Sequence, residues 1–99
     1  MVKIKQLEGV YHSIDLGLYK NSCDDVLKVS AVSRDYAGRK KRPEYYISQK
    51  EGKGFKYVSG LFKTKKPDEY SMDTQDKYGI KIYYLVSMTR DSLTIKKAP

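Results

Sequence analysis

The stretch Val10–Leu18, with the sequence VYHSIDLGL, sets the class of fold that we expect. Every second residue, counted from Val10, is apolar except for His12. The residues between them are tyrosine, polar residues or glycine. A period of two is typical of a β-strand that has one face in a core and the other in solvent. On this interpretation the side with Val10 and His12 points inward. Gly9 and Gly17 then indicate bulges or a bend, as a strand of a small barrel requires.

Further segments along the chain show strand-like patterns separated by turn residues. The segment 49–54 contains two glycines that can take positive φ and is predicted to be a hairpin loop. Five or six strands on one short chain predict a mainly β domain, either a small, strongly curved antiparallel sheet or an OB-like barrel. Closure is favoured because it removes exposed strand edges. The later predicted strands are Tyr45–Ser48, Phe55–Phe62, Lys77–Met88 and Ser92–Ile95.

The segment 22–36 is compatible with two structures. Its β-branched residues, Val26, Val29 and Val32, favour a strand. The alternative is a helix over about 22–36, capped by Ser22 with Asp25 at the capping-box position, which would make the domain α+β.

The segment Thr64–Gln75 is the longest with few large aliphatic residues. Proline is tolerated at the first position of a helix, and acidic residues suit the first turn. Pro67, followed by Asp68 and Glu69, therefore indicates the start of a short helix.

Length and composition restrict the classes of protein to consider. Ninety-nine residues suffice for a single domain, 1–99, and exclude a multi-domain enzyme or a doubly wound cofactor binder. One cysteine, Cys23, and one histidine, His12, exclude an internal disulfide and most familiar zinc sites. No apolar stretch reaches the roughly 18–20 residues of a membrane span, and the N-terminal residues do not resemble a signal peptide. We therefore expect a soluble, cytoplasmic protein without membrane association.

The charge is the most informative property of the sequence. Twenty Lys and Arg against 12 Asp and Glu give a net charge of +8, which predicts attraction to polyanions, nucleic acid first. Four consecutive cations, Arg39–Arg42, form a polar loop that is followed at once by Tyr45. Flexible cations neutralise phosphates, and tyrosine rings stack on bases. Lysines and aromatic residues also interleave from Lys53 onward, where Tyr57 is a candidate for exposed stacking.

Catalytic motifs are absent from the sequence. His12 lies beside Ser13, but neighbours on a strand point to opposite faces and cannot cooperate. A small hydrolase or nuclease would need the fold to bring His12 and a carboxylate together. The sequence contains no phosphate-binding loop, dinucleotide fingerprint or nucleophile elbow.

Three short motifs resemble the single-stranded-DNA-binding proteins of filamentous bacteriophages, the gene V protein type. Val32-Ser33-Arg34 with Gly38 and Arg42-Pro43-Glu44-Tyr45 is similar to that family's Val-Ser-Arg and Gly-Lys-Pro-Tyr. Tyr57-Val58-Ser59-Gly60-Leu61-Phe62 is similar to its Tyr-x-x-Gly-x-Tyr segment. Tyr78-Gly79, with Ile82 and Leu85, resembles its Phe-Gly and the aliphatic positions that follow.

This resemblance covers about half of the chain. It implies a dimeric OB-fold that coats single strands cooperatively, with Arg34, Arg42 and Tyr45 at a binding loop. The present loop is longer and more basic than the family's, Asp91–Pro99 extends past the matched end, and the first twenty residues match nothing. These departures weaken the implied homodimer in particular.

The hypothesis from sequence is a non-enzymatic, basic, tyrosine-rich protein that binds nucleic acid and prefers single strands. No cofactor or metal is expected. The alternative is a small viral or phage accessory protein that uses tyrosines to bind an acidic host protein, in the host cytoplasm. The predicted nucleic-acid-binding residues are Arg34, Arg39, Lys40, Lys41, Arg42, Tyr45, Lys53 and Tyr57.

Overall fold

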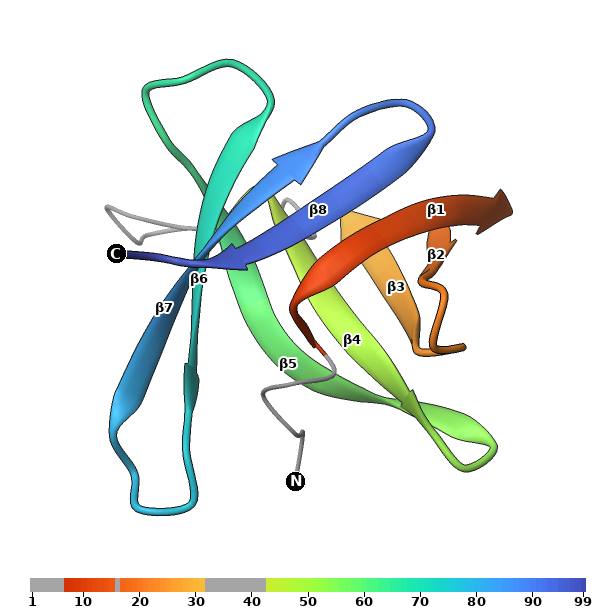
Figure 1. Ribbon diagram of the computed structural model, residues 1–99, viewed down its shortest axis with the longest axis horizontal. Coiled ribbons are helices and arrows are strands. Elements are labelled where there is room, and N and C mark those ends of the chain that lie inside the picture. Colours follow the sequence, from red (N-terminus) through yellow and green to blue (C-terminus); the bar gives the residue numbers. More distant parts are fainter. Residues whose placement is uncertain (1–6, 16, 32–42) are drawn as a thin grey trace.

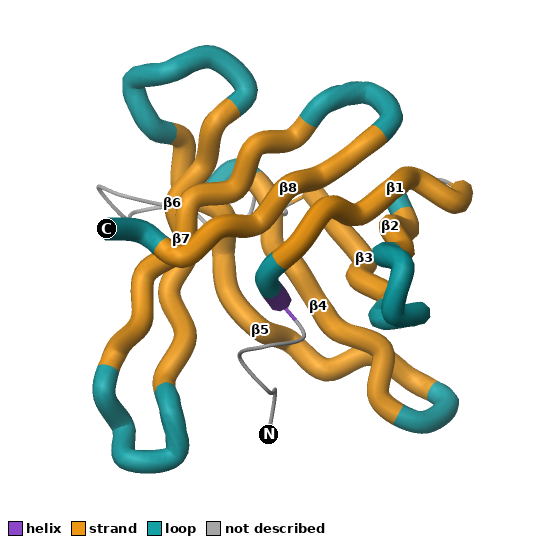
Figure 2. The backbone as a smooth tube through the Cα atoms, viewed as in Figure 1, coloured by secondary structure: helices purple, strands orange, loops and turns teal. Residues whose placement is uncertain are grey.

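Eight antiparallel strands follow one another around a closed barrel, and each pairs with its neighbours in sequence (Figures 1 and 2). A computed structural model describes residues 7–15, 17–31 and 43–99. Pairing of Gly9–His12 with Ile95–Ser92 joins the first strand to the last and closes the barrel. The strands are β1 (Gly9–Asp15), β2 (Leu18–Lys20), β3 (Val26–Ala31), β4 (Tyr45–Glu51), β5 (Gly54–Lys63), β6 (Glu69–Gln75), β7 (Lys81–Met88) and β8 (Ser92–Lys97).

The expected mainly β architecture with a small barrel is confirmed, and the structure corrects its details. The described residues form eight strands rather than five or six, and these follow one another around the barrel in simple up-and-down order. The described part of 22–36 contains β3, so the alternative helix there is wrong. The helix expected from Pro67 is also wrong, because β6 begins at Glu69 and pairs along its whole length with β7. Cross-strand pairing outweighs the local helix signal in both segments.

Tyrosines fill much of the barrel interior. Tyr11 and Tyr84 are fully buried, and Tyr19 and Tyr70 are 8% exposed. They pack with fully buried aliphatic residues, among them Leu27. Large aromatic side chains bury much apolar area each, which helps so short a chain to form a core. Burial raises the pKa of Tyr11 well above its ordinary value, and the nearby Asp25 and Cys23 add to this increase.

The orientation predicted for β1 is wrong. Tyr11 faces the core, whereas Val10 is 50% exposed and His12 also lies on the outer side. Alternation defines two faces of a strand without saying which one is inward. The tyrosine ring has a larger apolar area than the polar imidazole of His12, which favours burial of Tyr11.

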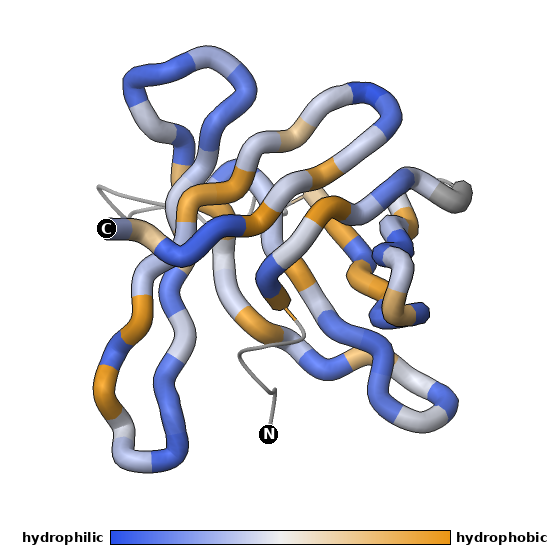
Figure 3. The backbone as a smooth tube through the Cα atoms, in the orientation of Figure 1, coloured by the Kyte–Doolittle hydropathy of each residue, from blue (hydrophilic) through white to orange (hydrophobic). Residues whose placement is uncertain are grey.

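The β6–β7 hairpin extends beyond its neighbours in the barrel wall (Figure 1). Its last pairs before the turn are Thr74 with Ile82 and Gln75 with Lys81. At the turn, the side chain of Asp76 accepts hydrogen bonds from the backbone N–H groups of Tyr78 and Ile80, at 2.8 and 3.0 Å. Figure 3 shows hydrophobic residues concentrated on the β7 side of this hairpin.

Candidate nucleic-acid interface

Three aromatic side chains are exposed on the outer side of β4 and β5. Tyr46 is 36% exposed, Phe55 42% and Tyr57 62%. The rings of Tyr46 and Tyr57 lie 6.2 Å apart between centroids with an interplanar angle of 42°. We call Tyr46, Phe55 and Tyr57 the outer aromatic face. Exposed rings of this kind are what a sequence-tolerant single-strand binder uses to stack bases.

Lysines surround this face. The Nζ atom of Lys28, on β3, lies 5.5 Å from the centroid of the Phe55 ring. Lys50 is exposed and is the cross-strand partner of Phe55, so the two side chains share a side of the sheet. Lys53 is exposed in the β4–β5 turn. Exposed lysines on β3, on β4 and in the β4–β5 turn thus accompany the outer aromatic face.

A β-bulge in β5 produces this arrangement. Ile47 pairs with Ser59, but the next residue, Ser48, pairs with Tyr57, so Val58 is extra. A bulge reverses the alternation of faces on the bulged strand. Tyr57 therefore points outward while Ser59 is only 4% exposed. Without the bulge, regular alternation along β5 would place the side chains of Tyr57 and Ser59 on the same face.

Tyr45 lies on the inner side, which differs from the exposed position expected for it. Its ring packs against the core and meets Tyr70 edge-on, with centroids 5.7 Å apart. Its neighbour Tyr46 occupies the exposed position beside Tyr57. The sequence shows two adjacent tyrosines and provides no signal for which of them faces solvent.

The predicted basic residues Arg34, Arg39, Lys40, Lys41 and Arg42 lie outside the described residues. The ends of the strands that flank this segment are described. Ala31, at the end of β3, pairs with Tyr45, at the start of β4. The basic segment is therefore attached to the barrel close to Tyr46, at the end of the aromatic face remote from Lys53.

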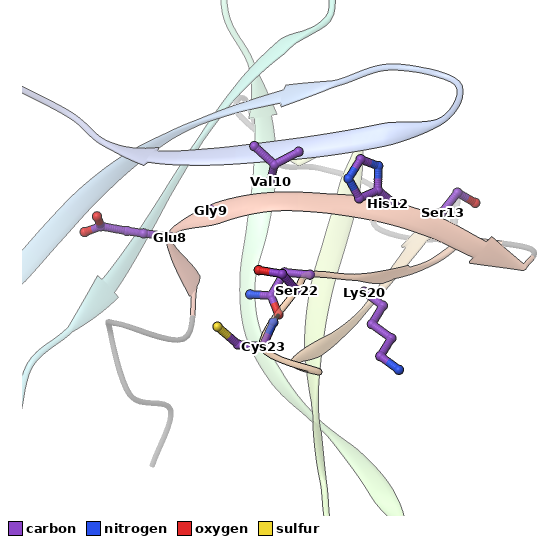
Figure 4. A pocket seen from close by; sticks show the side chains of 9 residues that line it. Glu8, Gly9, Val10, His12, Ser13, Lys20, Ser22 and Cys23 are labelled. Carbon is purple, nitrogen blue, oxygen red and sulfur yellow. Dashed lines mark hydrogen bonds between the residues drawn. The ribbon is translucent and has the colours of Figure 1, made fainter.

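His12 and Cys23 line a separate hollow of about 600 Å³ on the outer surface near β1 and β2 (Figure 4). Figure 4 shows the two side chains pointing in different directions from different elements. Asn21 organises the adjacent turn, since its Oδ1 accepts hydrogen bonds from the N–H groups of Cys23 and Asp25. Lys20 forms an exposed ion pair with Asp24 at 2.8 Å.

The described residues form no cluster of three or more His, Cys, Asp or Glu side chains that could hold a metal ion. Among the residues that the structure describes, two buried hydroxyls, those of Thr74 and Tyr84, have no hydrogen-bond partner. They lie on paired strands within the wall of the barrel and away from the outer aromatic face.

Comparison of the chain with protein-family models, curated proteins and solved structures gave no match. Among the described residues, no helix has the length and apolar character to cross a membrane.

Proposed function

We propose that this protein binds single-stranded nucleic acid without sequence preference, along the outer aromatic face. The observation that carries the proposal is the exposure of Tyr46, Phe55 and Tyr57 on one side of adjacent strands, with Lys28 over the Phe55 ring. The bases of a single strand stack on these rings while lysines contact the phosphates. Stacking contributes about 1–3 kcal/mol per base and tolerates any base, because each has a flat π face.

The net charge of +8 supports the same proposal. Arg34 and Arg39–Arg42 would contact phosphates at one end of the aromatic face, and Lys53 would do so at the other. The similarity of this chain to the phage single-strand binders in its short motifs favours DNA as the ligand. In this proposal the protein is not an enzyme and needs no cofactor.

The test is a titration of fluorescein-labelled poly-dT, followed by fluorescence anisotropy at about 50 and 200 mM salt. Tyr57→Ala should weaken binding by about 1–3 kcal/mol because one base loses its stacking partner. Charge reversal at Arg39–Arg42 should flatten the salt dependence, by about 0.7 in log–log slope for each phosphate that the variant no longer neutralises. Duplex DNA should bind more weakly, since its bases are already stacked.

Tyr78→Ala is the matched control. Tyr78 is a 76% exposed tyrosine with Lys77 Nζ at 5.2 Å from its ring centroid, but it lies on the β6–β7 turn. This variant should bind poly-dT as the wild type does. Equal losses for Tyr57→Ala and Tyr78→Ala, or unchanged binding for Tyr57→Ala, would contradict the proposed interface.

A second candidate function is binding of an acidic protein, such as a host protein contacted by a viral accessory protein. The exposed apolar side chains of the β6–β7 hairpin favour it, since Tyr78, Ile80 and Tyr83 are 76%, 61% and 56% exposed. Aromatic anchors with nearby cations suit such a partner. A pull-down from nuclease-treated host extract tests it. Retention of one acidic protein by the wild type and its loss with Tyr78→Ser/Ile80→Ser would support this function.

A further inference from the structure

One end of the barrel contains a hollow of about 500 Å³. Inward-facing side chains of Tyr19 on β2, Tyr45 on β4, Tyr70 on β6 and Met88 on β7 line it. Two positions further along their strands from Tyr45, Tyr70 and Met88, the side chains of Ile47, Met72 and Val86 are buried and fill the barrel interior. The hollow is therefore a shallow, aromatic mouth rather than a deep channel. Its volume is within the range of about 300–1,000 Å³ for small-molecule sites.

The tyrosines at this mouth offer unused hydrogen-bonding groups. Tyr19 and Tyr70 are only 8% exposed, yet within the described chain none of the three phenol groups has a hydrogen-bond partner. Burial raises the pKa of Tyr19 and Tyr70, and the neighbouring Tyr45 adds to both increases. The phenols of Tyr19 and Tyr70 are therefore neutral at physiological pH and able both to donate and to accept hydrogen bonds.

Two opposite charges also line the mouth, Asp68 from the β5–β6 connection and Arg90 from the β7–β8 turn. Neither side chain forms an ion pair with another described residue, and both are exposed. Asp68 has a φ of 58°, and its backbone oxygen accepts a hydrogen bond of 2.9 Å from the N–H of Met88. The backbone contact links the two loops that carry the charged groups.

We propose that the barrel mouth binds one nucleoside monophosphate unit whose base carries an exocyclic amino group. The flat base packs among Tyr19, Tyr45 and Tyr70, and the phosphate is held by Arg90, whose planar guanidinium suits phosphate oxygens. Asp68 accepts a hydrogen bond from the amino group, as carboxylates do from the amino group of cytosine. A long aliphatic ligand is disfavoured because buried side chains fill the barrel below the mouth.

This inference deepens the proposed function and rests on it, since the mouth would take a single base of a strand that crosses the outer aromatic face. Ala31 at the end of β3 and Tyr45 at the start of β4 both belong to the mouth lining, and Tyr46 of the outer aromatic face follows Tyr45 directly, so the two sites adjoin along β4. The outer face stacks any base. The mouth, in contrast, distinguishes bases that have an amino group from thymine and uracil.

The experiment is isothermal titration calorimetry with guanosine, cytidine and thymidine monophosphates and with ribose 5-phosphate. Guanosine and cytidine monophosphates should bind about tenfold more tightly than thymidine monophosphate, which corresponds to one hydrogen bond to a charged group. Asp68→Asn should reduce this preference, because an amide oxygen accepts a weaker hydrogen bond from the amino group than a carboxylate does. Asparagine tolerates the left-handed backbone at position 68, so the loop should keep its conformation. Arg90→Gln should weaken binding of all three nucleotides.

Tyr57→Ala separates this site from the outer face, because it should weaken poly-dT binding and leave the preference for nucleotides with an amino group unchanged. The inference is overturned if no nucleotide binds saturably, if ribose 5-phosphate binds as tightly as the nucleotides, if Asp68→Asn leaves the preference undiminished, or if Tyr57→Ala removes the preference. Poly-dT carries no amino groups, so failure of the mouth site and failure of the outer interface give different results.

Discussion

Gly17, in the turn between β1 and β2, is required by the backbone. Its φ is 92°, in the region that favours glycine, and an added Cβ would lie 2.9 Å from the carbonyl oxygen of Val29. The carbonyl oxygen of Gly17 also accepts a hydrogen bond from Val29 N–H at 2.9 Å. The bend that the sequence indicated at Gly17 thus allows the backbone of β3 to lie in close contact with the β1–β2 turn.

Gly17→Ala should lower the free energy of unfolding by about 2–4 kcal/mol, since it adds backbone strain to a steric clash. Gly54→Ala is the control, because an added Cβ there meets no atom within 4 Å and the φ is not positive. It should change stability by less than about 0.5 kcal/mol. Urea denaturation followed by circular dichroism measures both variants. Equal stability of the two variants would contradict the close approach at Val29.

Within the described residues, the turn end of the β6–β7 hairpin makes no strand pairing with the rest of the barrel. Pairing of β5 with β6 is limited to Phe62–Ser71 and Lys63–Tyr70, and pairing of β7 with β8 begins at Tyr84. Beyond these points, the hairpin strands pair with each other from Met72–Tyr84 to Gln75–Lys81. The exposed apolar residues at its turn consequently contribute little to the core.

The double variant Tyr78→Ser/Ile80→Ser should unfold within about 0.5 kcal/mol of the wild type, because exposed positions away from caps and networks tolerate substitution. Chemical denaturation provides the measurement. The paired internal control is Ile47→Ala, which should cost about 2–5 kcal/mol because Ile47 is fully buried. A loss for the hairpin variant that approaches the loss for Ile47→Ala would show that the turn packs on the barrel.

At the scale of the whole molecule, the buried tyrosines make the barrel sensitive to alkali. Burial raises the pKa of Tyr11, Tyr19, Tyr70 and Tyr84 above the phenol's value in the unfolded chain. Between these two pKa values the folded state binds more protons than the unfolded state. Stability is therefore complete below a pH of about 10 and decreases as the pH rises above it.

Each such tyrosine should contribute up to about 1.4 kcal/mol of lost stability per pH unit in this range. Urea denaturation at several pH values, with tyrosinate absorbance as a second signal, measures the slope. Tyr19→Phe should make the slope shallower, because phenylalanine does not ionise, whereas Tyr78→Phe at an exposed position should leave it unchanged. Identical slopes for these two variants would contradict the burial of the Tyr19 hydroxyl.

Much of the architecture could be predicted from local patterns. The period of two in Val10–Leu18 indicated β structure there, although the structure divides this stretch between β1, the turn at Gly17 and the start of β2. Gly52 indicated the β4–β5 hairpin, because side-chain alternation and positive φ are local properties. In the segments whose local signals conflicted, pairing with neighbouring strands decided the secondary structure. The β-branched residues of β3 and the segment after Pro67 both became strands because each has antiparallel neighbours on both sides.

Composition and periodicity alone determined the class of fold and the excess of positive charge. Which side of each strand faces the core depended on the tertiary structure. Tyr11 is buried and His12 exposed, and Tyr46 rather than Tyr45 joins Tyr57, because closure of the barrel and the bulge at Val58 set the orientation of each strand. A tyrosine ring suits either side of a strand, so its location depends on residues far away in the chain.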